Sequence, residues 1–504
     1  MSICLISLIQ YQFQFPLFFM KYRFSLLFFL SAISSVFAEK PDSLRYFGEI
    51  EASFSAGQHT PFWLVNNLQG LGSPEKNNGY LRAALFKDMK EENRFSWGAG
   101  IDLVGGWNQQ SPFYIHQLYG EVKYRSLGAW LGSKELWGNF TDHKLSSGDL
   151  LYSGNALPVP QLRLGIFDYA DVWGCNGWFS AKGYIAYGMF TDSKWQQSWH
   201  AEGTQYTKNV LYHSKGLWLR GGNTDKFPLQ GEIGLEMATQ FGGKSFYNGN
   251  WYKMESGFKS WIKAFLPVYS NQEFEGEENT SVDGNMMGAY NIAIAWKPKA
   301  DWSIRAYYEH FFEDESQMTF EYGWKDGLYG IEVELPRNRF VSKFVYEYLY
   351  TKQQTTGILW NETPEVPEQI SGRDDYYNNY LYNSWQHWGL GLGNPLVIAP
   401  IYNSDHYIHF LDNRIIAHHF GLEGHPFKNL SYRLLLSFSQ NWGSFDYPLP
   451  DVENNFNGML ELTWTPDKFR GWFGKFAVAG DSGSLLGKSF GAMVSIGKTG
   501  NFGL

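Results

Sequence analysis

The chain has 504 residues, of which 18% are aromatic, and it contains 54 glycines and two cysteines. Its formal net charge of −9 at pH 7 excludes the basic surface expected of a nucleic-acid-binding protein. A mean hydropathy of −0.35 argues against a bundle of transmembrane helices. It does not exclude a membrane barrel, whose strands turn only every second residue toward lipid.

The N-terminal region has the pattern of an export signal. Met20 precedes a positive pair, Lys21 and Arg23, which is followed by a mostly apolar run and by small residues ending at Ala38. We therefore expect translation to start at Met20 and the signal peptide to be cleaved after Ala38.

This processing would leave a leader of residues 1–38 and one outer-membrane barrel domain of residues 39–504. The mature chain would hold 39 basic and 50 acidic residues, a net charge of −11. Cys175 would be its one cysteine, so we expect neither an internal disulfide nor a lipid anchor.

Apolar and polar residues alternate in many segments. In the segment 95–104 the residues Phe95, Trp97, Ala99, Ile101 and Leu103 alternate with Ser96, Gly98, Gly100 and Asp102. This period of two predicts strands, several of them ~9–11 residues long, the length that a tilted strand needs to cross a bilayer. The same pattern occurs in Tyr46–Phe54, Ile115–Arg125, Trp178–Thr191, Val210–Arg220, Gly231–Phe241, Tyr290–Lys297, Trp302–Glu313 and Phe340–Thr351.

The connections between these segments are of two kinds. Asp326-Gly327 and Gly221-Gly222-Asn223 have the chemistry of tight hairpins, which outer-membrane barrels place at the periplasm. Long connections, which such barrels place outside the cell, are expected at 55–78, 134–161, 192–208, 267–285 and 352–400. Within one of them, Ser193–Asn209 is compatible with a short helix capped by Ser193.

One stretch, residues 146–163, departs from the alternation. Pro158 and Pro160 lack the N–H groups of a strand ladder and disfavour helix in the residues before them. Ser153, Gly154 and Asn155 provide short polar groups and close backbone approach. We expect a fixed non-strand element against the barrel interior or its rim; the alternative is an ordinary long loop.

Five motifs, in order along the chain, resemble the Wzi family of capsule assembly proteins, in the form seen in Bacteroidetes. They are Leu145–Val172 around Ser153-Gly154-Asn155-Ala156-x-Pro158-x-Pro160, His213-Ser214-Lys215, Glu309–Phe312 with Asp314, Asp326-Gly327-Leu328-x-Gly330, and Asp374-x-Tyr376-Tyr377-Asn378-Asn379 with Gly393-Asn394-Pro395-Leu396. The resemblance spans nearly the whole mature chain.

The resemblance implies an all-β, antiparallel transmembrane barrel of about 18 strands, with short helices in connections or on the periplasmic side. Ser193–Asn209 and Tyr376–Trp388 are the candidates for these helices. It also implies location in the outer membrane of a Gram-negative bacterium, and lectin-like binding of capsular or other surface polysaccharide rather than catalysis. Outer-membrane lipid and the capsule export machinery are the further partners. The motif residues expected to have structural or functional roles are Ser153, Gly154, Asn155, Pro158, Pro160, Arg163, His213, Lys215, Asp326, Gly327, Asn394 and Pro395.

Aromatic side chains offer faces on which sugar rings stack, and they also form the girdles of membrane barrels. The candidates for polysaccharide binding are Trp63, Trp107, Trp137, Trp173 and Trp178. Either role remains open for each of them.

Other chemistries have weaker support. His418 and His419 are adjacent and would point to opposite faces of a strand, which argues against a shared metal ion. Ser214 faces away from His213 on a strand, so we expect no nucleophile there. Glu332 and Glu334 share a face, as glycosidase carboxylates do, but also as ordinary lumen residues do. No metal or cofactor is expected. The alternatives to a binding protein are a diffusive porin and an outer-membrane lipid or glycan hydrolase.

Overall fold

A computed structural model describes residues 44–502, with gaps at 91, 173, 267–268, 275–276, 283, 300, 314, 356, 359, 361–362 and 368–371. The expected leader, Trp173 and Asp314 lie outside the described residues. The chain divides into a compact unit, Tyr46–Gly500, and a second unit of Met1–Arg45 with Asn501–Leu504. The first unit holds the barrel.

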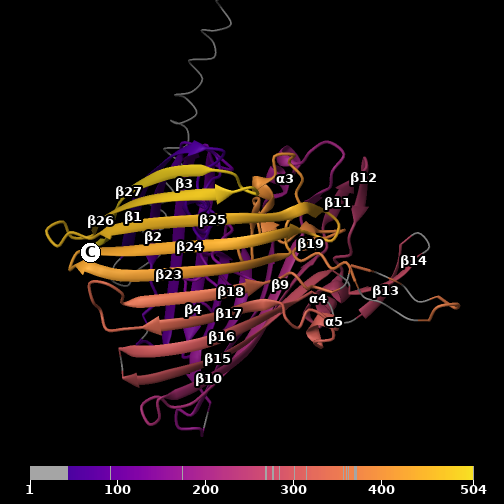
Figure 1. The fold of residues 1–504 in the computed structure, drawn as a ribbon. Helices are drawn as coiled ribbons and strands as arrows, with labels where there is room; N and C mark the ends of the chain where they lie inside the picture. The colour runs from indigo at the N-terminus through magenta and orange to yellow at the C-terminus, as the bar shows by residue number, and fades with distance from the viewer. Residues whose placement is uncertain are drawn as a thin grey trace, which may run out of the picture. The chain divides into compact units, whose positions relative to one another are not determined.

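Eighteen antiparallel strands form the wall, and the first strand pairs with the last to close it (Figure 1). This confirms the predicted fold class. The wall strands are β1 (Leu44–Gly57), β2 (Asn78–Lys87), β3 (Phe95–Trp107), β4 (Phe113–Tyr124), β5 (Leu127–Ser133), β6 (Gln161–Asp171), β7 (Phe179–Met189), β9 (Leu211–Gly221), β10 (Leu229–Phe241), β15 (Asn285–Lys299), β16 (Trp302–Phe312), β17 (Gly327–Glu334), β18 (Lys343–Tyr350), β23 (Ile415–Phe427), β24 (Leu430–Gly443), β25 (Pro448–Trp464), β26 (Trp472–Gly483) and β27 (Ser489–Phe502).

The two ends of the wall differ. At one end, the short-turn end, every connection between wall strands has at most eight residues, as 222–228 and 428–429 do. All five predicted long connections lie at the opposite, long-loop end. Asp326-Gly327 was wrongly predicted as a tight hairpin. Since β16 already ends at Phe312, these residues close a connection of 14 residues at the long-loop end.

The wall strands present apolar side chains outward. On β9, Leu217 and Leu219 are exposed, whereas Trp218 between them is buried and donates a hydrogen bond across the lumen face to Asn291. Exposed aromatic residues gather near the strand ends, for example Trp302 and Trp472 at the short-turn end. An apolar belt bordered by aromatic residues is the surface that a barrel presents to lipid.

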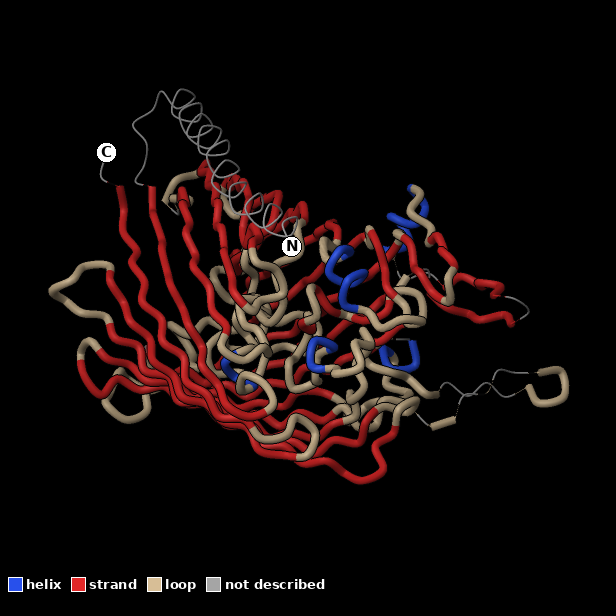
Figure 2. Tube along the Cα trace, turned by 90° about the horizontal axis from the view of Figure 1, so that it is seen from above, coloured by secondary structure: helices blue, strands red, loops and turns tan. Residues whose placement is uncertain are grey.

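Three of the long connections fold into the lumen and form a plug, which we define as residues 58–77, 134–160 and 374–413 (Figure 2). Phe62, Leu145, Val159, Trp385 and Phe410 of the plug are completely buried. They pack in one core with lumen-facing wall residues that include Ala289, Val345, Ala417 and Ala477. At the level of the plug, the described interior of the barrel is therefore filled by side chains.

Short elements complete the long-loop end. These are η1 (Phe62–Leu64), α3 (Ser193–Trp199), β8 (Tyr206–Lys208), β11 (Lys244–Tyr247), β12 (Asn250–Lys253), α4 (Phe258–Phe265), β13 (Tyr269–Phe274), β14 (Glu277–Val282), α5 (Glu315–Met318), β19 (Asn378–Asn379), β20 (Asn383–Ser384), β21 (Gln386–His387), β22 (Leu390–Gly391) and η2 (Pro400–Tyr402). None of the described helices is long and apolar enough to cross a membrane.

The helix predictions were partly wrong. The helix expected over 193–209 ends at Trp199, and its first capping position is Asp192 rather than Ser193. The segment 376–388 is not helical: it forms small β-ladders, because Tyr377, Asn383 and Trp388 adopt positive φ. The three α-helices and two 3₁₀ helices (η1 and η2) of the described residues all lie in connections of the long-loop end.

Candidate functional site: a plug and the cavity above it

Buried carboxylates of the wall hold the plug in place. The two oxygens of Glu347 on β18 accept hydrogen bonds from the Ser146 hydroxyl, the Ser147 N–H and hydroxyl, and the Tyr307 hydroxyl, at 2.5–2.7 Å. On β16, Glu309 accepts the Leu150 N–H at 2.8 Å. Since an unpaired buried carboxylate is costly, these bonds bind the plug to the wall.

Ser153, Gly154 and Asn155 join two plug segments that are far apart in sequence. The Ser153 N–H and hydroxyl donate to the carbonyls of Leu392 and Gly393, both at 2.7 Å. The Asn155 amide donates to the Gly391 carbonyl and accepts the Asn67 N–H. At Gly154, a Cβ would lie 2.2 Å from the Trp137 ring. The non-strand prediction holds for residues 146–160, whereas residues 161–163 already belong to β6.

The other motif residues of this region, Pro158, Pro160 and Arg163, contact residues of the wall strands. The carbonyls of Pro158 and Pro160 accept hydrogen bonds from Ser133 and Met189. The Arg163 guanidinium lies 3.3 Å from the ring centre of Tyr184 on the lumen face. The bonds of the two prolines tie the plug to the ends of β5 and β7.

The downstream motifs reach the same plug. Asn394 donates to Ser147 and to Gly148, against which Pro395 packs. Asp326 accepts the Gln353 N–H, the Gln354 N–H and the Tyr376 hydroxyl, and burial raises its pKa to about 7. At Gly327, which has a φ of +155°, a Cβ would lie 2.5 Å from the Glu309 carbonyl oxygen.

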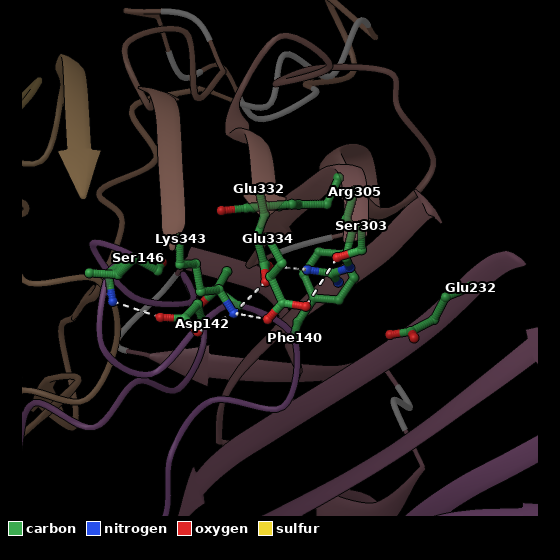
Figure 3. A network of polar contacts seen from close by, with 12 residues as sticks. Phe140, Asp142, Ser146, Glu232, Ser303, Arg305, Glu332, Glu334 and Lys343 are labelled. Carbon is green, nitrogen blue, oxygen red and sulfur yellow. Dashed lines mark hydrogen bonds and ion pairs between the residues drawn. The ribbon is translucent and has the colours of Figure 1, made fainter. Parts of the chain in front are cut away.

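Glu332 and Glu334, which resemble paired catalytic carboxylates, share one cation (Figure 3). Lys343 lies 2.7 Å from Glu332, 2.8 Å from Glu334 and 2.9 Å from Asp142 of the plug. Burial opposes the ionisation of Asp142, but the charge of Lys343 lowers its pKa below the ordinary value. Glu332 and Glu334 therefore belong to a network of paired charges on the lumen face of the wall, which is the alternative to a pair of catalytic carboxylates.

A second polar cluster has the composition of a metal site. Asp102, His116 and Glu135 bring their ligand atoms within 4.8 Å of one another. Arg82, however, already bridges Asp102 and Glu135. Burial raises the pKa of Glu135, but the hydrogen bond from His116 and the charge of Arg82 together lower it to about 2. The guanidinium therefore supplies the positive charge that a metal ion would bring.

A large open cavity lies at the long-loop end, partly over the plug. Its volume is about 1,090 Å³. It is lined by aromatic and histidine side chains (Tyr247, Tyr252, Tyr380, Tyr407, His409 and Tyr447), by acidic ones (Glu313, Asp374, Asp375, Asp405 and Asp446), by Arg373, and by small or amide residues including Thr204, Gln205, Ser245, Asn285, Asn378 and Asn379. Exposed tyrosines beside amides and carboxylates are suited to a hydroxyl-rich ligand.

The floor of this cavity is held rigidly. His409 binds Asp375 at 3.0 Å and stacks on Tyr407 with ring centres 4.9 Å apart. Tyr447 contacts both rings edge-on. Burial and the neighbouring Tyr447 raise the pKa of Tyr407 well above its ordinary value.

The lining carboxylates are engaged with protein groups. Asp374 accepts a hydrogen bond from the side-chain amide of Gln317. Glu313 accepts one from the backbone N–H of Tyr377, and Asp405 accepts one from the backbone N–H of Tyr407. Asp375 is hydrogen-bonded to the side chains of His409 and Asn413, and Asp446 forms an ion pair with Arg373. Their bonds identify positioning roles. A carboxylate has several acceptor sites, so one that is already bonded to a protein group can accept a further hydrogen bond from a hydroxyl group.

Of the five predicted tryptophans, the four that the structure describes, Trp63, Trp107, Trp137 and Trp178, do not line this cavity, and Trp173 lies outside the described residues. Trp63 is 2% exposed in the plug core, which leaves no face for a sugar ring. Trp137 stacks on His143 inside the plug. Trp107 ends β3 on the outward face, and Trp178 lies at the opposite, short-turn end. The positions of Trp107 and Trp178 fit the girdle alternative.

The adjacent histidines behave as strand geometry predicts. His419 faces the lumen and contacts Ser437 and the Leu145 carbonyl, whereas His418 faces outward and contacts Tyr346. His213 and Lys215 also face outward, beside exposed Leu217, while Ser214 faces the lumen. The side chains of Ser214 and its sequence neighbour His213 therefore lie on opposite faces of the wall.

We expect the substitution Ser214→Ala to leave barrel assembly and polysaccharide binding unchanged. Ser214 lies between Ala186 and Ala238 of the neighbouring strands, so an alanine fits the same surface. Heat-modifiable gel migration and a polysaccharide pull-down measure the two properties. Loss of binding in a correctly assembled barrel would favour the hydrolase alternative.

Sequence reasoning missed the cavity residues, because they come from five connections with no common periodicity. One signal was present: the run Asp374–Asn383 is unusually rich in Asp, Asn and Tyr, the residue types of sugar sites. Part of this run carries the family resemblance, but no binding role was predicted for Asn378, Asn379 or Tyr380.

Comparison with known proteins supports the fold. No family model and no curated protein matches the chain in sequence. The structure is similar to Wzi of Escherichia coli, described as an outer-membrane protein involved in group 1 capsule assembly and a carbohydrate-binding β-barrel, with 13% identity and a TM-score of 0.56 over 91% of this chain and 85% of that one. Similarity to OccAB2 of Acinetobacter baumannii (10% identity, TM-score 0.46, 92% and 98% covered) and to OprD of Pseudomonas aeruginosa (8%, 0.44, 92% and 96%) is lower. The chain is thus a closed 18-stranded barrel whose fold resembles that of Gram-negative outer-membrane proteins.

Proposed function

We propose that this protein binds a surface polysaccharide in the cavity at the long-loop end and so takes part in the assembly or retention of a capsule, without catalysis. The observation that carries the proposal is the filled lumen beneath an open cavity lined by tyrosines and carboxylates. A diffusive porin needs a water-filled channel, and the buried plug core opposes one. The fold similarity to a carbohydrate-binding barrel adds support.

The charge of the cavity limits the class of polysaccharide. Five carboxylates and one arginine line it, and that arginine pairs with Asp446. A polyanion would meet repulsion here, whereas neutral sugars offer hydroxyl groups that donate to carboxylates. The ligand that fits is a neutral or amino-sugar-containing polymer. Repeated weak binding along such a polymer would give avidity.

Two exposed tyrosines of the cavity are the natural targets for a test. Tyr380 and Tyr447 are 56% and 47% exposed, so truncation removes stacking surface without opening the core. If each face contributes about 1 kcal/mol, the double substitution Tyr380→Ala/Tyr447→Ala weakens binding of neutral polysaccharide about 30-fold. Tyr124→Ala, at an equally exposed tyrosine on the short-turn end, is the matched control.

The measurement is binding of neutral and of acidic polysaccharides to the purified barrel, with a complementation assay beside it. A strain that lacks the protein should shed capsule into the medium, and the Tyr124→Ala variant should restore retention where the double variant does not. Equal binding by both variants would remove the cavity as the site. Ion conductance by the parent protein would favour the porin instead.

A further inference from the structure

Two segments of the long-loop end fold over the outside of the wall. We call them the outer cover: α4 (Phe258–Phe265) and the segment 316–324 that includes most of α5. Helix α4 packs against β9 and β10. Tyr187 of β7 and Thr239 of β10 donate hydrogen bonds to the carbonyls of Trp261 and Ala264. Lys215 donates to the Phe265 carbonyl at the C-terminus of the helix, where a cation is favourable.

The outer cover shields polar groups on the lipid-facing side of the wall. His213 is 1% exposed and lies beneath Phe265, although Leu217 and Leu219 on the same face of β9 are open. His310 is completely buried: it bonds to the Gln317 carbonyl and stacks on Phe320 at 4.5 Å. Without the outer cover, these two histidines would be exposed to hydrocarbon, which is energetically unfavourable for a polar side chain.

The side of the cover that faces away from the wall is apolar. Phe258 is 81% exposed, and Ile262 and Leu266, four and eight residues further on, are 45% and 48% exposed. On the second segment, Phe320 and Trp324 are 48% and 55% exposed. Lys259 and Lys263 are four residues apart and therefore form a separate stripe along α4.

We propose that the outer cover is a membrane-interface element whose occupant is the outer leaflet of the bilayer. Its apolar side is continuous with the lipid-facing belt of β9 and β10, where Leu217, Leu219 and Ile233 are exposed. The lysine stripe fits the phosphate-bearing headgroups above that belt. An interfacial helix with an apolar face and a lysine face has this arrangement. The cover thus sets the depth of the barrel in the bilayer and keeps the cavity clear of the lipid surface.

The test places an environment-sensitive fluorophore on the cover. In a Cys175→Ser background of the mature chain, Phe258→Cys is labelled with NBD and the barrel is reconstituted in phosphatidylcholine vesicles containing phosphatidylglycerol, with or without doxyl-labelled acyl chains. Ile233→Cys on the belt is the lipid-facing control, and Lys194→Cys, on an exposed side of α3, is the water-facing control. Heat-modifiable migration confirms folding of each labelled protein.

We expect the label at position 258 to emit at shorter wavelength than the label at 194 and to be quenched by doxyl lipid as strongly as the label at 233. Emission and quenching like those of position 194 would overturn the proposal. A blue-shifted emission that doxyl lipid does not quench, and that depends on protein concentration, would assign the surface to a second copy of the chain and would equally overturn it.

Discussion

The substitution Gly154→Val should unseat the plug and make the barrel conduct ions. The added Cβ would lie 2.2 Å from the Trp137 ring and 2.7 Å from the Gln69 amide nitrogen, so at least one of these groups must shift. Overpacking of this kind costs about 1–3 kcal/mol or more. The strands do not depend on Gly154, so the barrel itself should still assemble.

Planar-bilayer conductance and heat-modifiable migration measure these two properties separately. Gly120→Val is the matched control, because a Cβ at Gly120 of β4 meets nothing within 4 Å and valine suits a strand. The control should assemble and stay closed. A closed and equally stable Gly154→Val barrel would show that the plug tolerates displacement there.

The largest loss of stability is expected from Glu347→Ala. Four donors from Ser146, Ser147 and Tyr307 would lose their acceptor in a buried site. Each unsatisfied buried group costs about 1–3 kcal/mol, partly relieved by water. We therefore expect a total loss of about 3–5 kcal/mol, the range for breaking a buried charged network.

A graded series checks the cause. Glu347→Gln keeps one acceptor oxygen and should lose less, and Tyr307→Phe removes a single donor and should lose least. The midpoint of the heat-modifiable gel transition in detergent ranks the three variants. A Glu347→Ala barrel no less stable than the Tyr307→Phe barrel would show that the carboxylate does not hold the plug.

Strands were predictable because their signal is local. Burial on alternate sides of the wall imposes a period of two, and the expected segments 95–104 and 231–241 fall within β3 and β10 almost to the residue. It was harder to predict which connections are tight hairpins and which are long loops. Asp326-Gly327 has the composition of a hairpin turn, but its place depends on where β16 ends, and Asp326 instead accepts hydrogen bonds from the connection after β18.

The plug and the cavity depend on pairings that no local pattern encodes. Ser153 and Asn155 were recognised as groups able to satisfy a buried backbone, yet their partners at 391–393 lie more than 200 residues further on. Tyr380, Tyr407 and Tyr447 meet only because three connections converge. The aromatic content suggested both sugar stacking and girdles, and sequence alone could not divide the tryptophans between them.

The long reach of the plug contacts also constrains the order of folding. The Phe62 N–H donates to Asp481 on β26, 419 residues away, at 2.8 Å. Since contacts so distant in sequence form only after the intervening chain is organised, the first plug segment cannot dock until nearly the last strand is in place. We therefore expect the barrel to be sealed late in assembly, once the wall is nearly complete.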